Sequence, residues 1–269
     1  MSRKPTLDIV IPCYNAADTL EEAVESAVGQ PCASLVWLVD DGSQDGTAEL
    51  IRSLAARYAN VRAEFLPRNS GVSVARNWGA LQSQADFTAF LDADDVYETD
   101  VLSAAYLALE QFDYLSLVRL KLKPWGFPER YTEHAGFSEA WQRLAMTVGG
   151  NMVFRRSILL ACGGFPQDGL FRRFGGEDAA LGIALTRSSV VATAFDEQAA
   201  AVRHRYRAGI HAERLLDVAL FGRQPERITE EDRSRAEAVT EAICRRLAEV
   251  KAHAEFSQTG IMPLKLTYA

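Results

Sequence analysis

Short apolar runs and amphipathic helical patterns alternate from residue 7 to residue 91, and this alternation constrains the fold more than any other feature. The expected strands are 7–11 (LDIVI), 35–39 (LVWLV), 61–66 and 87–91 (FTAFL). Three helices are expected between them: one that starts near Thr19, one that follows the turn at 40–47 and runs to about Tyr58, and one over 72–84. Strands joined to helices by short connections favour a largely parallel sheet with helices on both faces. The pattern therefore predicts an α/β fold.

Two of the expected helices carry a start signal. Thr19 and Glu22 have the spacing of a capping box, in which each side chain bonds the backbone N–H of the other residue. Towards the other end of the chain, Thr229 is predicted to cap a terminal amphipathic helix over 229–252.

After residue 100 the alternation weakens. Residues 119–136 mix Lys, Arg, Pro, Gly and aromatic residues, which predicts an irregular and partly mobile segment. Residues 163–178 are rich in glycine and lead into a predicted helix over 177–187.

Bulk properties disfavour several classes of protein. The formal charge of −7 disfavours a nucleic-acid partner, because nucleic-acid binders usually carry a basic excess. The four cysteines form no CxxC pair, which indicates reduced thiols rather than a zinc site or disulfides. No apolar run approaches the roughly 20 residues of a membrane span. We therefore expect a cytoplasmic protein, with a peripheral contact at the inner face of the membrane left open.

Polar residues gather where the expected strands end, which is where open α/β sheets bind ligands. They are Tyr14 and Asn15, Asp40 and Asp41, and the run Asp92 to Asp95. If the fourth strand continues through LDADD, Asp92 and Asp94 share one face and repel each other unless a cation lies near them. Oxygen ligands of this kind suit Mg²⁺ or Mn²⁺, with substrate phosphates completing the shell.

The same run has a plainer interpretation. Acidic residues after a strand are common in turns, so the triplet alone indicates no more than a candidate cation site. Asp95 is expected to point away from the other two, as a helix cap or a structural partner.

Four segments together resemble the family 2 glycosyltransferases, which have a GT-A fold. They are IVIPCYN at 9–15, VDDGSQDGT at 39–47, NSGVSVARNWGA at 69–80 and FLDADD at 90–95, and the resemblance resumes at 163–185 with a glycine-phenylalanine stretch and a Glu-Asp pair. The resemblance implies a Rossmann-like, mostly parallel sheet flanked by helices. It also implies a nucleotide-sugar-binding half (1–98), an acceptor-binding half of the same domain (99–215) and a C-terminal helical extension (216–269).

The resemblance assigns the donor side of the site. Its nucleotide-binding residues would be Pro12, Tyr14, Asn15, Asp41, Arg76, Asp92 and Ala93. Tyr14 would lie against the base, Asp41 would accept from the uracil N–H, and Asp92 would contact the ribose. Two alternatives stay open: Tyr14 as a packed core aromatic, and Arg76 in a salt bridge to a nearby aspartate rather than on the nucleotide or its pyrophosphate.

The resemblance also implies metal ligands. Asp94 would bind Mn²⁺ or Mg²⁺ directly, with Asp92 beside it. In the basic stretch VRHRYR (202–207), His204 is a candidate third ligand, and Arg203 or Arg205 is a candidate for covering the pyrophosphate. The alternative for this stretch is a solvated basic strand edge.

The acceptor side centres on Asp178, which matches the Asp of the family's Glu-Asp pair. An inverting transfer needs a carboxylate that takes the proton of the acceptor hydroxyl, and the resemblance gives that role to Asp178. Glu177 would orient the acceptor, and Gly175 and Gly176 let the backbone approach the substrate closely. The alternative for Asp178 is a charge that favours the start of a helix.

The predicted function is therefore an inverting, metal-dependent glycosyltransferase that uses a nucleoside-diphosphate sugar, with a UDP-sugar expected, in cell-envelope glycan biosynthesis. The acceptor could be a polysaccharide, a lipid-linked sugar, lipopolysaccharide or a protein. Three alternatives remain: a sugar-phosphate nucleotidyltransferase, although no GxGTR-like phosphate loop occurs near the N-terminus, a retaining transferase, which the Glu-Asp pair argues against, and a non-catalytic protein that binds a sugar nucleotide.

Overall fold

The computed structural model describes residues 3–223, 228–252 and 258–265. The strands are β1 (Leu7–Cys13), β2 (Ala33–Asp40), β3 (Val61–Phe65), β4 (Phe87–Phe90), β5 (Val96–Tyr97), β6 (Leu115–Trp125), β7 (Met152–Arg155), β8 (Val190–Ala194), β9 (Ala201–Arg205) and β10 (Gly260–Pro263). The helices are α1 (Leu20–Val28), α2 (Thr47–Arg57), α3 (Val72–Gln82), α4 (Ser103–Gln111), α5 (Glu129–Thr132), α6 (Phe137–Ala145), α7 (Arg156–Ala161), α8 (Gly169–Phe174), α9 (Glu177–Ser188), α10 (His211–Phe221) and α11 (Glu230–Ala252).

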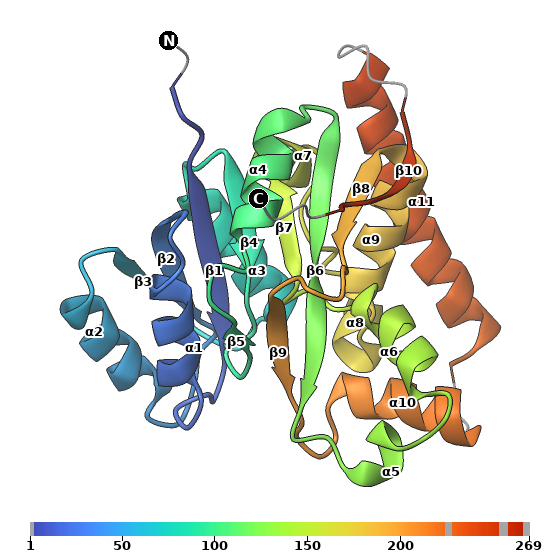
Figure 1. Ribbon diagram of the computed structural model, residues 1–269, viewed down its shortest axis with the longest axis horizontal. Helices are drawn as coiled ribbons and strands as arrows, with labels where there is room; N and C mark the ends of the chain where they lie inside the picture. The colour runs from blue at the N-terminus through green and yellow to red at the C-terminus, as the bar shows by residue number, and fades with distance from the viewer. Residues whose placement is uncertain (1–2, 224–227, 253–257, 266–269) are drawn as a thin grey trace.

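One open, mixed sheet forms the centre of the molecule, which confirms the predicted α/β class (Figure 1). Its strand order is β10-β8-β6-β7-β4-β1-β2-β3, and β1 pairs in parallel with both β2 and β4. The antiparallel strand β7 lies between β4 and β6. Off this path, β9 pairs in parallel with the second half of β6 and antiparallel with β5.

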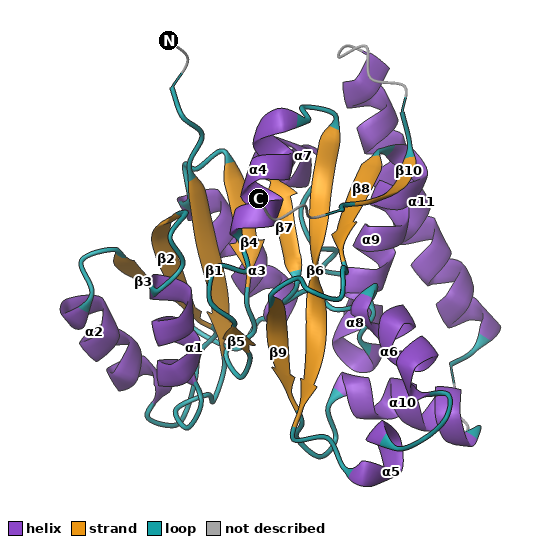
Figure 2. Cartoon of the chain, viewed as in Figure 1, coloured by secondary structure: helices purple, strands orange, loops and turns teal. Residues whose placement is uncertain are grey.

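Helices cover both faces of this sheet (Figure 2). Along β1, the side chains of Leu7, Ile9 and Ile11 join the core that includes α1, α2 and α4, whereas Val10 joins the core that includes α3, α9 and α11. This division follows from the alternation of side chains along a strand. Burying each such side chain contributes roughly 1.5–3 kcal/mol, which fixes the strand's register and places its carboxyl end at the site.

The prediction of an irregular segment over 119–136 is wrong for its first part. Residues 119–125 continue β6, an eleven-residue strand, and α5 covers part of the remainder. The composition was misleading because Leu120 and Leu122 are buried while Lys121 faces the other way and bonds two backbone carbonyls. The basic residues thus belong to an alternating strand pattern rather than to a loop.

The two predicted helix caps have different outcomes. The capping box at Thr19 and Glu22 is wrong: the Thr19 hydroxyl donates to the carbonyl of Ala93 at 2.9 Å, and no side chain caps α1. At α11 the prediction is confirmed, because Asp232 N donates to Thr229 Oγ1 at 3.1 Å. Thr19 therefore hydrogen-bonds the acidic triplet instead of capping the start of α1.

The C-terminal part completes the sheet as well as adding helices. Helix α11 packs on α9, and β10 pairs in parallel with β8. The boundary expected between residues 215 and 216 falls inside α10, which packs against α6. None of the described helices combines the length and apolar composition needed to cross a bilayer. All four cysteines are free thiols, as predicted.

Candidate active site

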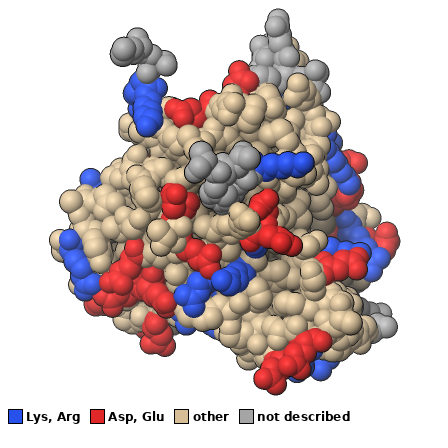
Figure 3. Space-filling view, viewed as in Figure 1, with Lys and Arg blue, Asp and Glu red and all other residues tan. Residues whose placement is uncertain are grey.

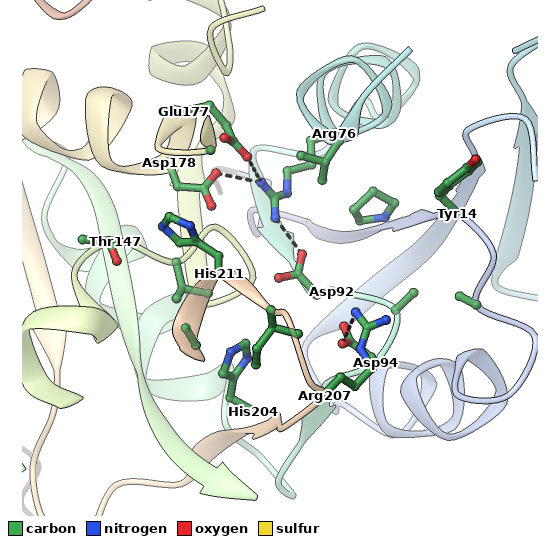
Figure 4. Close-up of a pocket in the computed structure, with 18 of the residues that line it drawn as sticks. Tyr14, Arg76, Asp92, Asp94, Thr147, Glu177, Asp178, His204, Arg207 and His211 are labelled. Carbon is green, nitrogen blue, oxygen red and sulfur yellow. Dashed lines mark hydrogen bonds and ion pairs between the residues drawn. The ribbon is translucent and has the colours of Figure 1, made fainter. Parts of the chain in front are cut away.

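A cavity of about 370 Å³ opens where β1 and β4 end and α9 begins (Figure 4). The predicted site residues that line it are Pro12, Tyr14, Asn15, Arg76, Asp92, Ala93, Asp94, Glu177, Asp178 and His204. Of the other candidates, Asp41, Arg203 and Arg205 do not line it. The structure thus brings residues from both halves of the sequence into one pocket.

The acidic triplet lies in a turn and not in a strand. Strand β4 ends at Phe90, and Asp95 N donates to the carbonyl of Asp92 at 3.0 Å, so the expectation of a continuing strand is wrong. Asp92 and Asp94 still face the same pocket, each paired with an arginine: Asp92 Oδ1 lies 2.7 Å from Arg76 Nη2, and Asp94 Oδ2 lies 2.6 Å from Arg207 Nη2.

Arg76 is the buried cation of the site. It comes from α3, its side chain is 3% exposed, and its guanidinium donates to both Asp92 Oδ1 and Asp178 Oδ1 at 2.7 Å. Glu177 Oε1 lies 3.6 Å from the same group. Burial acts to lower the pKa of Arg76, but the three surrounding carboxylates raise it, so the group stays charged. The salt-bridge alternative for Arg76 is the arrangement that the structure shows.

Asp178 faces the pocket from the first turn of α9. Its Oδ1 accepts from Arg76, and its Oδ2 accepts from Gly149 N at 2.8 Å. Burial raises the pKa of Asp178 to about 7, although Arg76 opposes the rise and Glu177 adds to it. A carboxyl group with this pKa can exist in either protonation state near neutral pH, which suits proton transfer.

Two glycines that the sequence analysis missed let these groups meet. A Cβ atom on Gly149 would lie 2.6 Å from Arg76 Nη1 and 2.7 Å from Asp178 Oδ1, and one on Gly150 would lie 2.8 Å from Asp92 Oδ2. Any side chain at either position would displace the charged groups. The signal in the sequence was the glycine pair, which lies one residue before the buried strand β7.

A buried arginine holds the loop that carries this pair. Arg119, on β6, is 1% exposed, and its Nη1 donates to the carbonyl of Val148 at 3.2 Å. Burial lowers the pKa of Arg119 to about 10, with Asp178 opposing the shift. The longest strand of the sheet therefore supports the loop that hydrogen-bonds Asp178.

Asp95 has the structural role that was predicted for it. It is fully buried, its Oδ2 lies 2.7 Å from His204 Nδ1, and its Oδ1 accepts from Arg205 N at 3.0 Å. Burial acts to lower the pKa of His204, but Asp95 raises it to about 9. Because Asp95 holds Nδ1, Nε2 is the ring nitrogen left for a metal, as in sites where a carboxylate orients a ligating histidine, and the role of His204 as a ligand stays a prediction.

Of the residues predicted to bind the nucleotide, Tyr14 is exposed, whereas the side chains of Asn15 and Asp41 hold neighbouring loops through hydrogen bonds. Tyr14 is 47% exposed at the pocket mouth, so it is not a packed core aromatic. Asn15 has a φ of 48° and accepts from Gln44 N at 2.9 Å, which holds the loop after β1. Asp41 is buried, and its two carboxylate oxygens accept from the backbone N–H groups of Ser70 and Gly71.

The basic stretch at 202–207 places a different arginine in the pocket from those considered. Arg203 and Arg205 both lie over the ring of Trp125, and Arg205 also bonds Glu22. Arg207 is the arginine of this stretch that lines the pocket, where it pairs with Asp94.

His211, the first residue of α10, was also missed. It lines the pocket near Asp178, and its buried Nδ1 has no hydrogen-bond partner in the described part of the chain. Burial lowers the pKa of His211, and the charge of Arg214 adds to the effect. A neutral imidazole in this position can donate a hydrogen bond to a substrate hydroxyl or accept one from it.

The fold is also found in solved glycosyltransferase structures. Residues 1–349 of S. aureus TarS in complex with UDP superpose with a TM-score of 0.56 at 20% identity, covering 94% of this chain and 72% of that one. The mannosyltransferase PcManGT from Pyrobaculum calidifontis, in complex with GDP-Man and Mn²⁺, superposes with a TM-score of 0.60 at 18% identity, covering 96% and 77%. At these identities the likeness shows the GT-A fold alone.

Curated relatives match a shorter segment. An uncharacterized glycosyltransferase of Haemophilus influenzae is 35% identical over 99 residues, which is 36% of this chain and 40% of that protein. The putative teichuronic acid biosynthesis glycosyltransferase TuaG of Bacillus subtilis is 36% identical over 101 residues, or 37% and 40%. The matches thus cover less than half of these relatives.

The sheet has the GT-A arrangement of these solved glycosyltransferases, and the acidic triplet and the Glu-Asp pair face one pocket. A family model identifies the class of protein: residues 8–163, more than half of the chain, match "Glycosyl transferase family 2". The chain belongs to this family.

Proposed function

We propose that the protein transfers a sugar from a nucleoside-diphosphate sugar, a UDP-sugar, to an acceptor hydroxyl with inversion of the anomeric carbon. The observation that carries this proposal is the position of Asp178. It faces the same pocket as the triplet, but it comes from the opposite wall and its pKa is raised to about 7. One wall would thus hold the leaving diphosphate while the other holds a base.

The mechanism requires one displacement. Asp178 takes the proton of the acceptor hydroxyl as the oxygen attacks the anomeric carbon. The hydrogen bond from Arg76 orients the carboxylate of Asp178 in the pocket. Glu177 and His211, which line the same wall, hold the other hydroxyls of the acceptor. Tyr14 lies against the base of the nucleotide, and Pro12 and Asn15 line the pocket beside it. Asp41 holds the neighbouring loop at Ser70, which contacts the base.

The acidic side chains of the triplet fit a divalent cation that is shared with the diphosphate. Asp92 Oδ2 and Asp94 Oδ1 accept no hydrogen bond from any described residue, so each carboxylate keeps an oxygen for a ligand. No three His, Cys, Asp or Glu side chains of the described ranges gather into a complete metal site. Two carboxylates are enough for Mg²⁺ or Mn²⁺, because these ions bind through one or two carboxylates together with substrate phosphates.

When bound there, the cation would offset the charge that grows on the leaving diphosphate. The side chain of Arg207 is 58% exposed, so it can leave Asp94 at little cost and approach the same diphosphate. Support for the cation comes from PcManGT, whose structure holds GDP-Man and Mn²⁺. Support for a UDP-sugar comes from TarS, which was solved with UDP and with UDP-GlcNAc.

The acceptor is proposed to be a glycan of the cell envelope, free or linked to a lipid or protein. The name of TuaG, which refers to teichuronic acid biosynthesis, supports this class. Membership of the family favours a transferase over a nucleotidyltransferase or a non-catalytic binding protein.

The test is a screen of UDP- and GDP-sugars for binding and for slow hydrolysis, with and without Mn²⁺. We expect a UDP-sugar to raise the melting temperature in the presence of Mn²⁺ and to release UDP at a measurable rate. Preferential stabilisation by a GDP-sugar would contradict the choice of base, and binding with no UDP release for any sugar would favour the non-catalytic alternative.

A further inference from the structure

A second cavity adjoins the active site on the side of the proposed base. It has a volume of about 330 Å³ and shares Val72, Gly175, Glu177 and Arg214 with the first cavity. Its outer wall is formed by α8, which precedes the start of α9 (Figure 1). A group bound in this cavity would therefore lie beside Glu177 and next to Asp178.

Three arginines line this cavity and have no acidic partner. Arg172 and Arg173 lie in the last turn of α8, and Arg214 lies on α10. Within the described ranges, no carboxylate comes within ion-pair distance of any of the three. By contrast, Arg76 and Arg207 in the main pocket are both paired with aspartates.

The two acidic side chains that line the cavity are already engaged elsewhere. Asp168 caps α8 through Leu170 N and lies 3.0 Å from Arg235 Nε. Glu177 is turned towards Arg76. Asp41 and Asp232 act on Arg172 and Arg173 from beyond ion-pair distance. The three guanidinium groups therefore keep donors for a ligand in the cavity.

The positive potential of the cavity comes from these arginines and not from the backbone. Helix α3 begins after Gly71 in the same wall, but the carboxylate of Asp41 already accepts from Ser70 N and Gly71 N there. On the face shown in Figure 3, by contrast, acidic and basic side chains are intermixed, and the net charge of the chain is −7.

We propose that this second cavity binds an anionic group, a phosphate or a carboxylate, carried by the acceptor glycan. Guanidinium groups bind both anions through paired, charge-assisted hydrogen bonds. Because the cavity adjoins Asp178 rather than the triplet, its ligand belongs to the acceptor side of the reaction. This inference rests on the proposed function and names the acceptor class: a glycan that carries a negative charge near the hydroxyl that is glycosylated.

The test compares three small probes, glucose, glucose 6-phosphate and glucuronate, titrated into the full chain saturated with UDP and Mn²⁺. We expect both anionic probes to bind about tenfold more tightly than glucose, the gain that one or two charge-assisted hydrogen bonds supply. Arg172→Ala/Arg214→Ala should abolish this preference, while Arg172→Lys/Arg214→Lys should restore part of it. Arg143→Ala, which removes an exposed arginine of α6, is the matched control and should leave the preference unchanged.

Three results would overturn the inference. Equal affinity for glucose and the anionic probes would show that the arginines recognise no anion. Competition between UDP and glucose 6-phosphate, or an equal loss of UDP affinity in the double variant, would assign the arginines to the donor. Failure of the chain to bind any nucleotide sugar would instead contradict the proposed function, so the two failures can be distinguished. The arginines are exposed, and an unchanged melting temperature of the double variant checks that it folds.

Discussion

The guanidinium of Arg76 joins Asp92 to Asp178, donating to one oxygen of each at 2.7 Å. The two aspartates are 86 positions apart in the chain and come from opposite walls of the pocket. A single buried cation thus connects the acidic triplet, which we propose handles the leaving group, with the carboxylate that we propose activates the acceptor.

Transfer should depend on pH through Asp178. Since its pKa is raised to about 7 and a base acts when deprotonated, the rate should fall as the pH drops below about 7 and level off above it. Asp178→Asn should lower transfer at least about 100-fold, the lower range of general-base catalysis, while UDP affinity stays near that of the wild type. The measurements are kcat/KM against pH and UDP titration; transfer near the wild-type rate in this variant would rule out Asp178 as the base.

Removal of Arg76 should affect both stability and the pH profile. Arg76→Met leaves buried carboxylates without their partner, which should cost about 3–5 kcal/mol of unfolding free energy in urea denaturation. Because Arg76 lowers the pKa of Asp178, the rise in rate with pH should move to higher pH in this variant. Arg76→Lys keeps the charge and is the control. An unmoved profile in a folded Arg76→Met protein would show that the guanidinium does not act on the base.

A methyl group on Gly149 should damage the site more than the fold. The added Cβ would meet Arg76 and Asp178, and these groups can move only by breaking their hydrogen bonds. We expect Gly149→Ala to reduce kcat about 10-fold or more, as small misplacements of reacting groups do. The matched control is Gly169→Ala, whose Cβ would meet no atom within 4 Å. Equal activity of the two variants would contradict this account.

Asp94 should govern the dependence on the cation. Asp94→Asn removes the charge that we propose binds the metal, so Mn²⁺ should no longer tighten UDP binding in calorimetric titrations. UDP affinity without metal should change little. A Mn²⁺ effect of wild-type size in this variant would assign the cation to other ligands.

Much of the fold could be read from the sequence because its first half is locally consistent. The apolar runs that became β1, β2 and β4 have strand length, and the helical patterns between them predicted α1, α2 and α3. Strand β6 was missed because its alternation of Leu and Lys resembles a loop by composition, and its burial depends on β8 and β9, which follow much later in the chain.

The same contrast applies to the site. The sequence by itself determined which residue types lie at the strand ends, and hence that Asp92 and Asp94 were candidates; Glu177 and Asp178 became candidates through the resemblance to the family. Tertiary structure alone decided that Arg76 bridges two of them, that Gly149 and Gly150 permit this, and that Arg207 rather than Arg203 faces the pocket. These relationships depend on how distant segments pack, and no local pattern in the chain encodes the distances between them.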